Sequence, residues 1–396
     1  MVRGPQGSVT TEFRVTFPNL SIRKDQEMQI QVFLNGKELP ELAMIMLTRT
    51  TTTTTTTTTM GKKMDRNKSQ KEKTGKVVLP SFVDTNTLVP SEKALETLVS
   101  TFMDKQREHD DNKNNSTFFG CLRFQIQDNS SATVSAYANA RLFVWDATTD
   151  RVVVCDIDGT VTRSNVRGVW DTVLTKSYRY LHTGVCALLN KLSGHGANIR
   201  IMYLTSRPVD ISNLTRQFLQ SVRQTTVGLP AGPLVSQNQP LARILFSELV
   251  TKDVHLFKSK ALIGVRDLFR AATGNQQHNP FIAGFGNTDF DTLAYDTAGV
   301  PLLYQIDKSS RISLFHTIGD DKDGNGGDGD GDDDHNDETR RQRVQREERR
   351  KKSLLRRNSF RKTQKVYSRG YSDPELLKDF RASSSDLLAM DGLNAL

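Results

Sequence analysis

The chain contains the stretch Val152-Val153-Val154-Cys155-Asp156-Ile157-Asp158-Gly159-Thr160, in which an apolar run leads into two aspartates and a glycine. A short continuous apolar run of this kind is typical of a strand buried on both faces of a parallel sheet. Gly159 permits a sharp turn after the strand. The two carboxylates are therefore expected at the carboxyl edge of the sheet, where α/β proteins bind their ligands.

Asp156 and Asp158 repel each other unless a cation or a shared proton compensates, so the pair either binds a metal or holds one member protonated. Both arrangements suit phosphoryl transfer. In that chemistry one aspartate attacks phosphorus to give an acyl-phosphate, while the second protonates the leaving oxygen and then deprotonates water. Mg²⁺ favours oxygen ligands and offsets the accumulating negative charge. The alternative is that the two aspartates only cap the turn after the strand.

Around this stretch, residues 151–318 alternate short apolar runs with segments of helical length, which is the pattern of a doubly wound α/β domain. We predict strands at residues 152–155, 199–204, 261–265 and 281–285. Helices are predicted at 183–192 and 211–222, the second with Ser212 as its N-terminal cap.

Further polar residues follow these elements in order along the chain. A hydroxyl, Thr205, comes after the run 201–204, and an ammonium group, Lys258, follows Leu256 and Phe257. The sequence 284–291 then supplies Asn287 and Asp291. A hydroxyl and an ammonium group can hold the oxygens of a transferring phosphate, and a second acidic cluster can complete a metal site. Each residue alone has an ordinary structural explanation, but their joint order favours a phosphatase site.

The segments before residue 151 have the alternation of half-buried strands. Residues 13–17 and 28–34 alternate, and Asn35-Gly36 is a turn-forming pair, which indicates a hairpin. Strand character returns at residues 122–126 and 141–145, which need partners to form a sheet. We expect residues 1–47 and 118–150 to complete one β domain together.

Two segments are predicted to be disordered. Residues 48–117 contain ten consecutive threonines and a lysine-rich stretch, which suggests an inserted linker. Residues 319–396 form an acidic and then basic tail with a short helix expected at 374–380. Residues 320–338 hold ten acids and one lysine, net −9, whereas residues 340–365 hold thirteen bases and two acids, net +11. The basic block of +11 alone exceeds the chain's net charge of +9, so the charge of the whole chain does not indicate nucleic-acid binding.

Composition adds further limits. The three cysteines have neither disulfide-framework nor zinc-ligand spacing, and Cys155 is expected to be a small core residue. No run reaches the roughly 18 apolar residues of a membrane span, and the first five residues lack the apolar core of a signal peptide. These features indicate the cytosol or the nucleus. Residues 321–326 mimic the opening of a calcium loop, but Asp332 stands where the bidentate glutamate belongs, so calcium binding is not predicted.

The site residues resemble those of the haloacid dehalogenase superfamily, and the stretches 156–165, 214–216, 229–234, 257–258 and 285–287 are similar to the lipins, the phosphatidate phosphatases. The resemblance implies a Rossmann-like catalytic domain with catalytic residues Asp156 and Asp158. Implied phosphate-binding residues are Gly159, Thr160, Thr205 and Lys258. Implied ligands of Mg²⁺ are Asp156, Asp158, Asn287 and Asp291.

The amino-terminal residues 2–7, 13–17 and 35–36 also resemble the lipin N-terminal module, which implies an immunoglobulin-like β-sandwich beside the catalytic domain. Three departures stand out. Lipins generally carry serine where Thr205 stands and arginine where Thr288 stands. The chain also starts after the position of the amphipathic membrane-docking helix of that module.

The resemblance further implies a partner and a location: phosphatidate in membranes, reached from the cytoplasm by peripheral attachment to the endoplasmic reticulum, or a place in the nucleus. The basic segment Arg340–Lys365 is the candidate for membrane attachment, because each basic residue near an anionic surface contributes on the order of 1 kcal/mol. A solvated run and a nuclear-import signal are the alternatives. Ser359 follows Arg356 and Arg357, as in a basophilic kinase site, where phosphate would weaken membrane attraction.

These observations predict a Mg²⁺-dependent phosphatidate phosphatase that forms diacylglycerol and phosphate through an aspartyl-phosphate. Two alternatives remain. One is a phosphatidate-binding module without catalysis, against which both acids argue. The other is a phosphatase for soluble phosphate esters or phosphoproteins, which would share all of the chemistry.

Overall fold

In this computed structural model the described residues are 1–11, 27–48, 75–78, 90–110, 119–127, 134–163, 180–194, 198–237, 250–316 and 364–390. The strand predicted at 13–17, the threonine run, the calcium-loop lookalike and the basic segment up to residue 363, with Ser359, lie outside them. The chain divides into two compact units, Met1–Asp146 and Ala147–Leu396. No helix of the described part is long and apolar enough to span a membrane.

The first unit contains a sheet in the order β6-β5-β3-β7-β8, with β4 paired to β3. The strands are β3 (Glu27–Leu34), β4 (Lys37–Glu38), β5 (Met44–Thr48), β6 (Gly75–Val78), β7 (Phe119–Gln127) and β8 (Val134–Phe143). A smaller sheet has the order β2-β1-β9, from Gly7–Val9, Val2–Gly4 and Trp145–Asp146. A short 3-10 helix, η1, covers Pro40–Leu42.

The predicted β pairing is confirmed, since β3 pairs antiparallel with β7 across the sequence between them. Asn35 and Gly36 form the turn from β3 to β4 with φ of 50° and 86°, a backbone region that suits this residue pair. Every second residue of β3 from Ile30 to Leu34 is buried, as the alternation required. The immunoglobulin-like sandwich itself stays a prediction.

The prediction of a disordered linker over residues 48–117 is wrong for two segments. Strand β6 pairs with β5, and helix α1 (Glu92–Asp110) buries Leu98 and Phe102 in the core of the first unit. Residues 91–103 carry apolar side chains at helical spacing, which was overlooked because the threonine run and the lysine-rich stretch earlier in residues 48–117 led us to expect disorder throughout.

The second unit is built on a seven-stranded sheet in the order β14-β11-β10-β15-β16-β17-β18. The first five are parallel, and β17 and β18 are antiparallel additions. Their bounds are β14 Leu234–Gln237, β11 Ile199–Pro208, β10 Arg151–Asp156, β15 Phe281–Gly286, β16 Leu302–Ile306, β17 Ile312–His316 and β18 Lys365–Tyr367. A short hairpin joins β12 (Arg223–Gln224) and β13 (Val227–Gly228).

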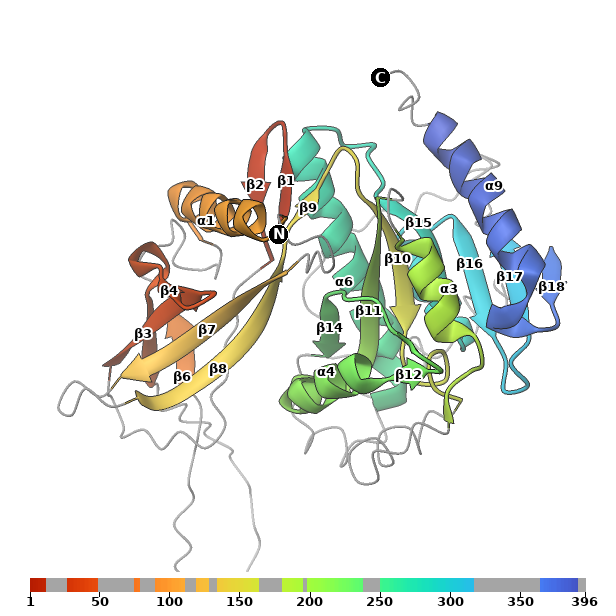
Figure 1. Cartoon of the computed structure of the whole chain (residues 1–396), viewed down its shortest axis with the longest axis horizontal. Helices are drawn as coiled ribbons and strands as arrows, with labels where there is room; N and C mark the ends of the chain where they lie inside the picture. The colour runs from red at the N-terminus through yellow and green to blue at the C-terminus, as the bar shows by residue number, and fades with distance from the viewer. Residues whose placement is uncertain are drawn as a thin grey trace, which may run out of the picture. The chain divides into compact units, whose positions relative to one another are not determined.

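The helices of this unit are α3 (Val185–Leu192), α4 (Ser212–Ser221), α6 (Val250–Thr273), α7 (Asp289–Thr297) and α9 (Pro374–Met390), with short 3-10 turns η3 (Val209–Ile211) and η4 (Gly370–Ser372). Figure 1 shows α3 and α6 on opposite faces of the central strands. All six residues of β10 are buried, as the apolar run predicted. The doubly wound α/β prediction is thereby confirmed.

Two local predictions are wrong. Residues 261–265 belong to helix α6, where Leu262, Val265 and Phe269 are buried at helical spacing. A short apolar run cannot be assigned to strand or helix by periodicity alone. Ser212 is the first residue of α4, and Ile211 occupies the cap position without a side-chain cap.

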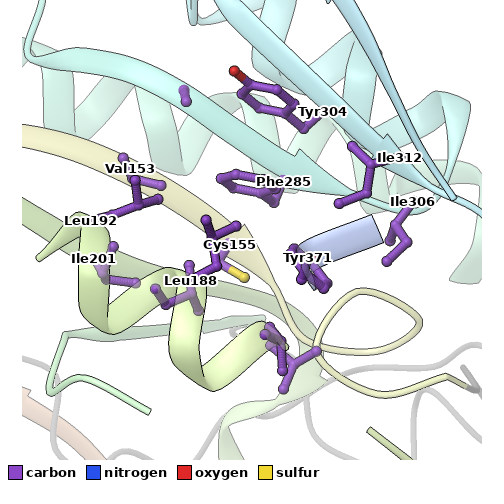
Figure 2. Close-up of a cluster of buried hydrophobic side chains, with 14 of the residues drawn as sticks. Val153, Cys155, Leu188, Leu192, Ile201, Phe285, Tyr304, Ile306, Ile312 and Tyr371 are labelled. Carbon is purple, nitrogen blue, oxygen red and sulfur yellow. The ribbon is translucent and has the colours of Figure 1, made fainter. Parts of the chain in front are cut away.

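The tail prediction also needs correction. Strand β18 pairs with β17, and the predicted helix at 374–380 is confirmed and extends to Met390. Tyr371, Leu376 and Phe380 are buried in the same core as β10 and α3. Figure 2 shows Tyr371 beside Phe285 and Cys155 in this core. Residues 365–383 are therefore an integral part of the second unit.

Candidate active site

Parallel strands bring the predicted site residues to one edge of the sheet. Asp156 is the last residue of β10 and pairs with Leu204 of β11, so Thr205 lies one residue further along the same edge. Strand β15, on the other side of β10, ends at Gly286 and is followed by Asn287. Helix α6 contributes Lys258.

The centre of the site is a buried chain of three charged groups. The ammonium group of Lys258 donates to Asp156 Oδ1 at 2.6 Å and to Asp291 Oδ1 at 2.5 Å. The side chains of Asp156, Lys258 and Asp291 are all 3–4% exposed. The other oxygen of Asp156, Oδ2, accepts from the hydroxyl of Thr160 at 3.1 Å. Asp156 is therefore held at both oxygens.

Burial dominates the electrostatics of this cluster. It raises the pKa of Asp156 to about 7, and the negative charges of Asp291 and Asp158 act in the same direction against the opposing effect of Lys258. Burial lowers the pKa of Lys258, but its two carboxylate partners outweigh that effect and raise it overall. Burial raises the pKa of Asp291, yet Lys258 and the hydrogen bonds from its neighbours lower it overall. Asp291 is thus the better stabilised anion of the two.

Asp291 is fixed by the start of helix α7. Its Oδ2 accepts from the backbone N–H of Asn287 at 3.1 Å, from the backbone N–H of Thr288 at 3.0 Å and from the Thr288 hydroxyl at 2.7 Å. Thr288 and Asp291 form a reciprocal capping box at this helix end. The residue that departs from the lipin pattern therefore has a clear structural role here. A Cβ on Gly286 would lie 2.5 Å from the Cβ of Asp291, so glycine is required for this approach.

Asp158 has a different set of partners. Arg207 donates through Nε to Oδ2 at 2.8 Å and through its NH2 nitrogen to Oδ1 at 2.6 Å. The Thr205 hydroxyl donates to Oδ2 at 3.3 Å. The Asp158 side chain is 12% exposed, so it is more accessible to solvent than that of Asp156.

The turn between the acids and α3 is held through its backbone. Gly159 has φ of 88°, which favours glycine. Its carbonyl lies 3.2 Å from Nε2 of His182, whose Nδ1 lies 2.8 Å from the Ser310 hydroxyl. Tyr371, from the C-terminal segment, donates its hydroxyl to the carbonyl of Thr160 at 3.1 Å. Two side chains distant in sequence thus fix the carbonyls of this turn.

The structure brings together most of the residues that the sequence singled out. Asp156, Thr160, Lys258 and Asp291 form one hydrogen-bonded cluster, and Asp158 contacts Thr205. Asn287 contributes its backbone N–H to Asp291.

Arg207, His182 and Tyr371 were missed. Arg207 had a usable signal, because it is a charged residue at the end of an apolar strand, two positions after Thr205. His182 and Tyr371 had none, since only folding brings them to the turn.

The carboxylate oxygens of the site are suitable ligands for a divalent cation, but few of them are grouped together. The described residues hold no group of three or more His, Cys, Asp or Glu side chains arranged to bind a metal. Arg207 pairs with the carboxylate of Asp158, whereas Asp156 and Asp291 are two more deeply buried carboxylates that share the single cation Lys258. Mg²⁺ is typically held by one or two carboxylates, with waters and substrate phosphate completing its shell. Burial and the neighbouring carboxylates raise the pKa of Asp156 despite the opposing effect of Lys258, and a bound cation would act in the same direction as Lys258.

Comparison with known proteins gives a consistent result. Residues 119–321, about half of the chain, match the family LNS2 (Lipin/Ned1/Smp2). The chain is 33% identical over 204 residues to phosphatidic acid phosphohydrolase 1 of Saccharomyces cerevisiae, covering 50% of this chain and 22% of that protein. It is 31% identical over 199 residues to phosphatidate phosphatase PAH1 of Arabidopsis thaliana, covering 50% and 21%.

A human protein gives the same picture. The chain is 31% identical over 179 residues to phosphatidate phosphatase LPIN1 of Homo sapiens, covering 45% of this chain and 19% of that protein. The matched region thus spans about a fifth of the length of these relatives. Because the family match covers half of the chain and includes all the strand-edge residues of the site, the chain belongs to the lipin family.

Proposed function

We propose that the protein is a Mg²⁺-dependent phosphatidate phosphatase, which converts phosphatidate and water to diacylglycerol and phosphate. The observation that carries the proposal is the buried contact of Lys258 with both Asp156 and Asp291 at the carboxyl edge of the sheet. The names of the relatives support the choice of phosphatidate as substrate.

In the first step a carboxylate oxygen of Asp156 attacks phosphorus and forms a P–O bond, while the bond from phosphorus to the glycerol oxygen breaks. The leaving oxygen takes a proton from Asp158, so the products are diacylglycerol and an aspartyl-phosphate. Thr160 and Lys258 hold the two oxygens of Asp156, which keeps the nucleophile in a fixed orientation. Their donor groups, with Thr205 and the backbone at Gly159, can then contact the phosphate oxygens.

In the second step Asp158, now ionised, takes a proton from a water molecule whose oxygen attacks phosphorus. The acyl-phosphate bond breaks, which releases phosphate and regenerates the Asp156 carboxylate and a protonated Asp158. Asp158 suits both steps because its side chain is more exposed than that of Asp156 and can exchange protons with solvent. Asp291 keeps Lys258 charged and close to the nucleophile.

Asp156 and Asp291 are the residues proposed to hold Mg²⁺, with Asn287 and the backbone near Asp158 as further oxygen donors. The ion, when bound, supplies positive charge that polarises the phosphoryl group. Titration of the protein with Mg²⁺ should raise its melting temperature, because a ligand that binds the native state stabilises it. Asp291→Asn should weaken this stabilisation without unfolding the protein, whereas an unchanged titration would contradict the assignment.

The experiment that tests the proposal compares phosphate release from phosphatidate in mixed micelles with release from a soluble phosphate ester. Wild type is expected to need Mg²⁺ and to prefer phosphatidate, and Asp156→Asn and Asp158→Asn are expected to be inactive. Preference for the soluble ester would favour a phosphatase of soluble substrates. Binding of phosphatidate with no turnover would favour a non-catalytic module.

A further inference from the structure

Arg207 is the charged residue at this edge of the sheet that the mechanism above does not use. It lies near the end of strand β11, and its side chain is only 2% exposed. A buried guanidinium group needs fixed partners, because it stays charged in proteins and its desolvation is unfavourable. Its partners therefore indicate what it does.

Two elements fix the guanidinium group in place. The backbone N–H of Arg207 donates to the Thr205 hydroxyl at 3.1 Å, which anchors the residue on β11. Its NH1 nitrogen donates to the Thr215 hydroxyl of α4 at 3.4 Å, and its guanidinium carbon lies 5.6 Å from the ring centroid of Phe218 on the same helix. Contacts with a strand and a helix thus hold the guanidinium group independently of its contact with an acid.

The other two guanidinium nitrogens, Nε and NH2, form a two-point contact with Asp158, at 2.8 and 2.6 Å. Asp158 lies in the turn after β10, and Arg207 lies in β11 where its pairing with β14 shifts register between Thr205 and Pro208. The contacts of Arg207 with Thr205 and with helix α4 hold it there, so the guanidinium group can set the orientation of the carboxylate in the turn. A bidentate contact fixes the plane of the carboxylate, which a single hydrogen bond does not.

We propose that Arg207 is a positioning residue that orients Asp158 for proton transfer to the leaving oxygen. This inference rests on the proposed function and names a residue that determines its rate. A proton donor contributes to catalysis only when it lies within hydrogen-bond reach of the atom that it protonates. Misplacement of about 1 Å is sufficient to lower a rate about 100-fold. Lysine in place of Arg207 keeps the charge but loses the fork geometry.

The test is the Arg207→Lys variant, assayed with phosphatidate in mixed micelles in H₂O and D₂O. We expect kcat to fall by about 100-fold and KM to change little. The loss should not exceed the contribution of general acid catalysis by Asp158. The solvent isotope effect on kcat should rise, because proton transfer through a misplaced Asp158 becomes rate-limiting. A purely structural role would not produce this isotope effect.

The chain provides a matched control on the same strand. Arg200, at the opposite end of β11, also donates to a buried aspartate, with Nε 2.9 Å from Asp150 Oδ1. Arg200→Lys should leave kcat, KM and the isotope effect close to wild type. If Arg207→Lys does not fold, Thr215→Val removes a group that orients Arg207 and should change kcat and the isotope effect in the same direction by less.

The outcomes separate the two proposals. An inactive wild type overturns the proposed function. If wild type is active, the role of Arg207 is overturned when Arg207→Lys keeps the wild-type kcat. The role is also overturned when the variant loses kcat without a rise in the isotope effect, or when it mainly raises KM. Direct binding of substrate phosphate by Arg207 would then explain the loss.

Discussion

At the scale of single residues, the site is a balance of buried charges in which two aspartates share one cation and the third aspartate has its own. Lys258 contacts Asp156 and Asp291, while Arg207 contacts Asp158. Three carboxylates and two cations leave the cluster one negative charge in excess among these five residues. That excess agrees with the raised pKa of Asp156 and with a role for a divalent cation.

Replacing Lys258 by Met should lower the free energy of unfolding by about 3–5 kcal/mol, since it leaves two buried carboxylates without a counter-charge. Urea denaturation at pH 7 measures the change. The double variant Lys258→Met with Asp156→Asn should recover part of the loss, because one of the two charges is then absent. A loss below about 1 kcal/mol in the single variant would contradict the picture of a buried ion cluster.

His182 should make stability depend on pH. Burial lowers its pKa from 6.5 to about 4, so the folded protein binds the proton less readily than the unfolded chain. Its contribution to stability is therefore present above pH 6.5 and is lost as the pH falls toward 4. The free energy of unfolding measured across this window should decline less steeply in His182→Gln than in wild type. Parallel curves would show that His182 does not titrate as described.

At the scale of elements, the carboxyl-terminal strand and helix complete the second unit. Strand β18 extends the sheet, and α9 supplies Leu376 and Phe380 to the core that also contains Cys155 and Phe285. Tyr371, between them, reaches the turn at Thr160. The segment therefore links the stability of the sheet to the geometry of the site, although it lies outside residues 119–321 that match the family.

Phe380→Ala should destabilise the second unit by about 3–5 kcal/mol, because it removes a buried aromatic side chain and leaves a cavity. Lys378→Ala on the same helix is the matched control, since its side chain is 76% exposed, and it should change stability by less than about 0.5 kcal/mol. Equal effects of the two substitutions in urea denaturation would indicate that α9 does not pack on this core.

Tyr371→Phe should lower kcat while leaving the fold intact, because it removes the hydroxyl that donates to the Thr160 carbonyl and keeps the buried ring. Leaving that buried carbonyl without its donor should also reduce stability by about 1–3 kcal/mol. Steady-state kinetics with phosphatidate and thermal unfolding measure the two effects. Wild-type kinetics in this variant would mean that the turn keeps its geometry without Tyr371.

At the scale of the whole molecule, acidic and basic residues are concentrated in two consecutive segments of the sequence. The basic segment, residues 340–365, carries net +11 and follows an acidic segment of net −9. We expect the basic segment to hold the protein at anionic membranes, as the proposed substrate phosphatidate would require. Replacing Arg349, Arg350, Lys351 and Lys352 by Gln should weaken binding to vesicles of phosphatidate and phosphatidylcholine, measured by co-sedimentation.

The same binding should fall as salt is added, because exposed charges are screened over about 8 Å at physiological ionic strength. Vesicles of phosphatidylcholine alone provide the control and should bind both proteins weakly. If the substituted protein binds the anionic vesicles as tightly as wild type, attachment depends on another part of the chain.

The sequence by itself determined the α/β class of the second unit. It also singled out Asp156, Asp158, Thr205, Lys258 and Asp291 as candidate site residues. Lys258 and Asp291 lie in helices α6 and α7. For Asp156, Asp158 and Thr205 the information is instead local, because they lie at the carboxyl ends of buried strands and parallel strands present these ends at one edge. The hairpin at Asn35-Gly36 was predictable for the same reason, since two adjacent residues define it.

Only the tertiary structure decided which cation each acid contacts. It also showed that the segment 365–383 contributes to the core of the second unit. Arg207 and Asp158 are separated by 49 positions and Tyr371 and Thr160 by 211, and no periodicity relates such pairs. The strand-like run at 261–265 became part of α6, because burial of one helical face outweighed its short apolar pattern. Local pattern thus located the Asp156–Thr160 turn, and contacts between distant residues determined its geometry.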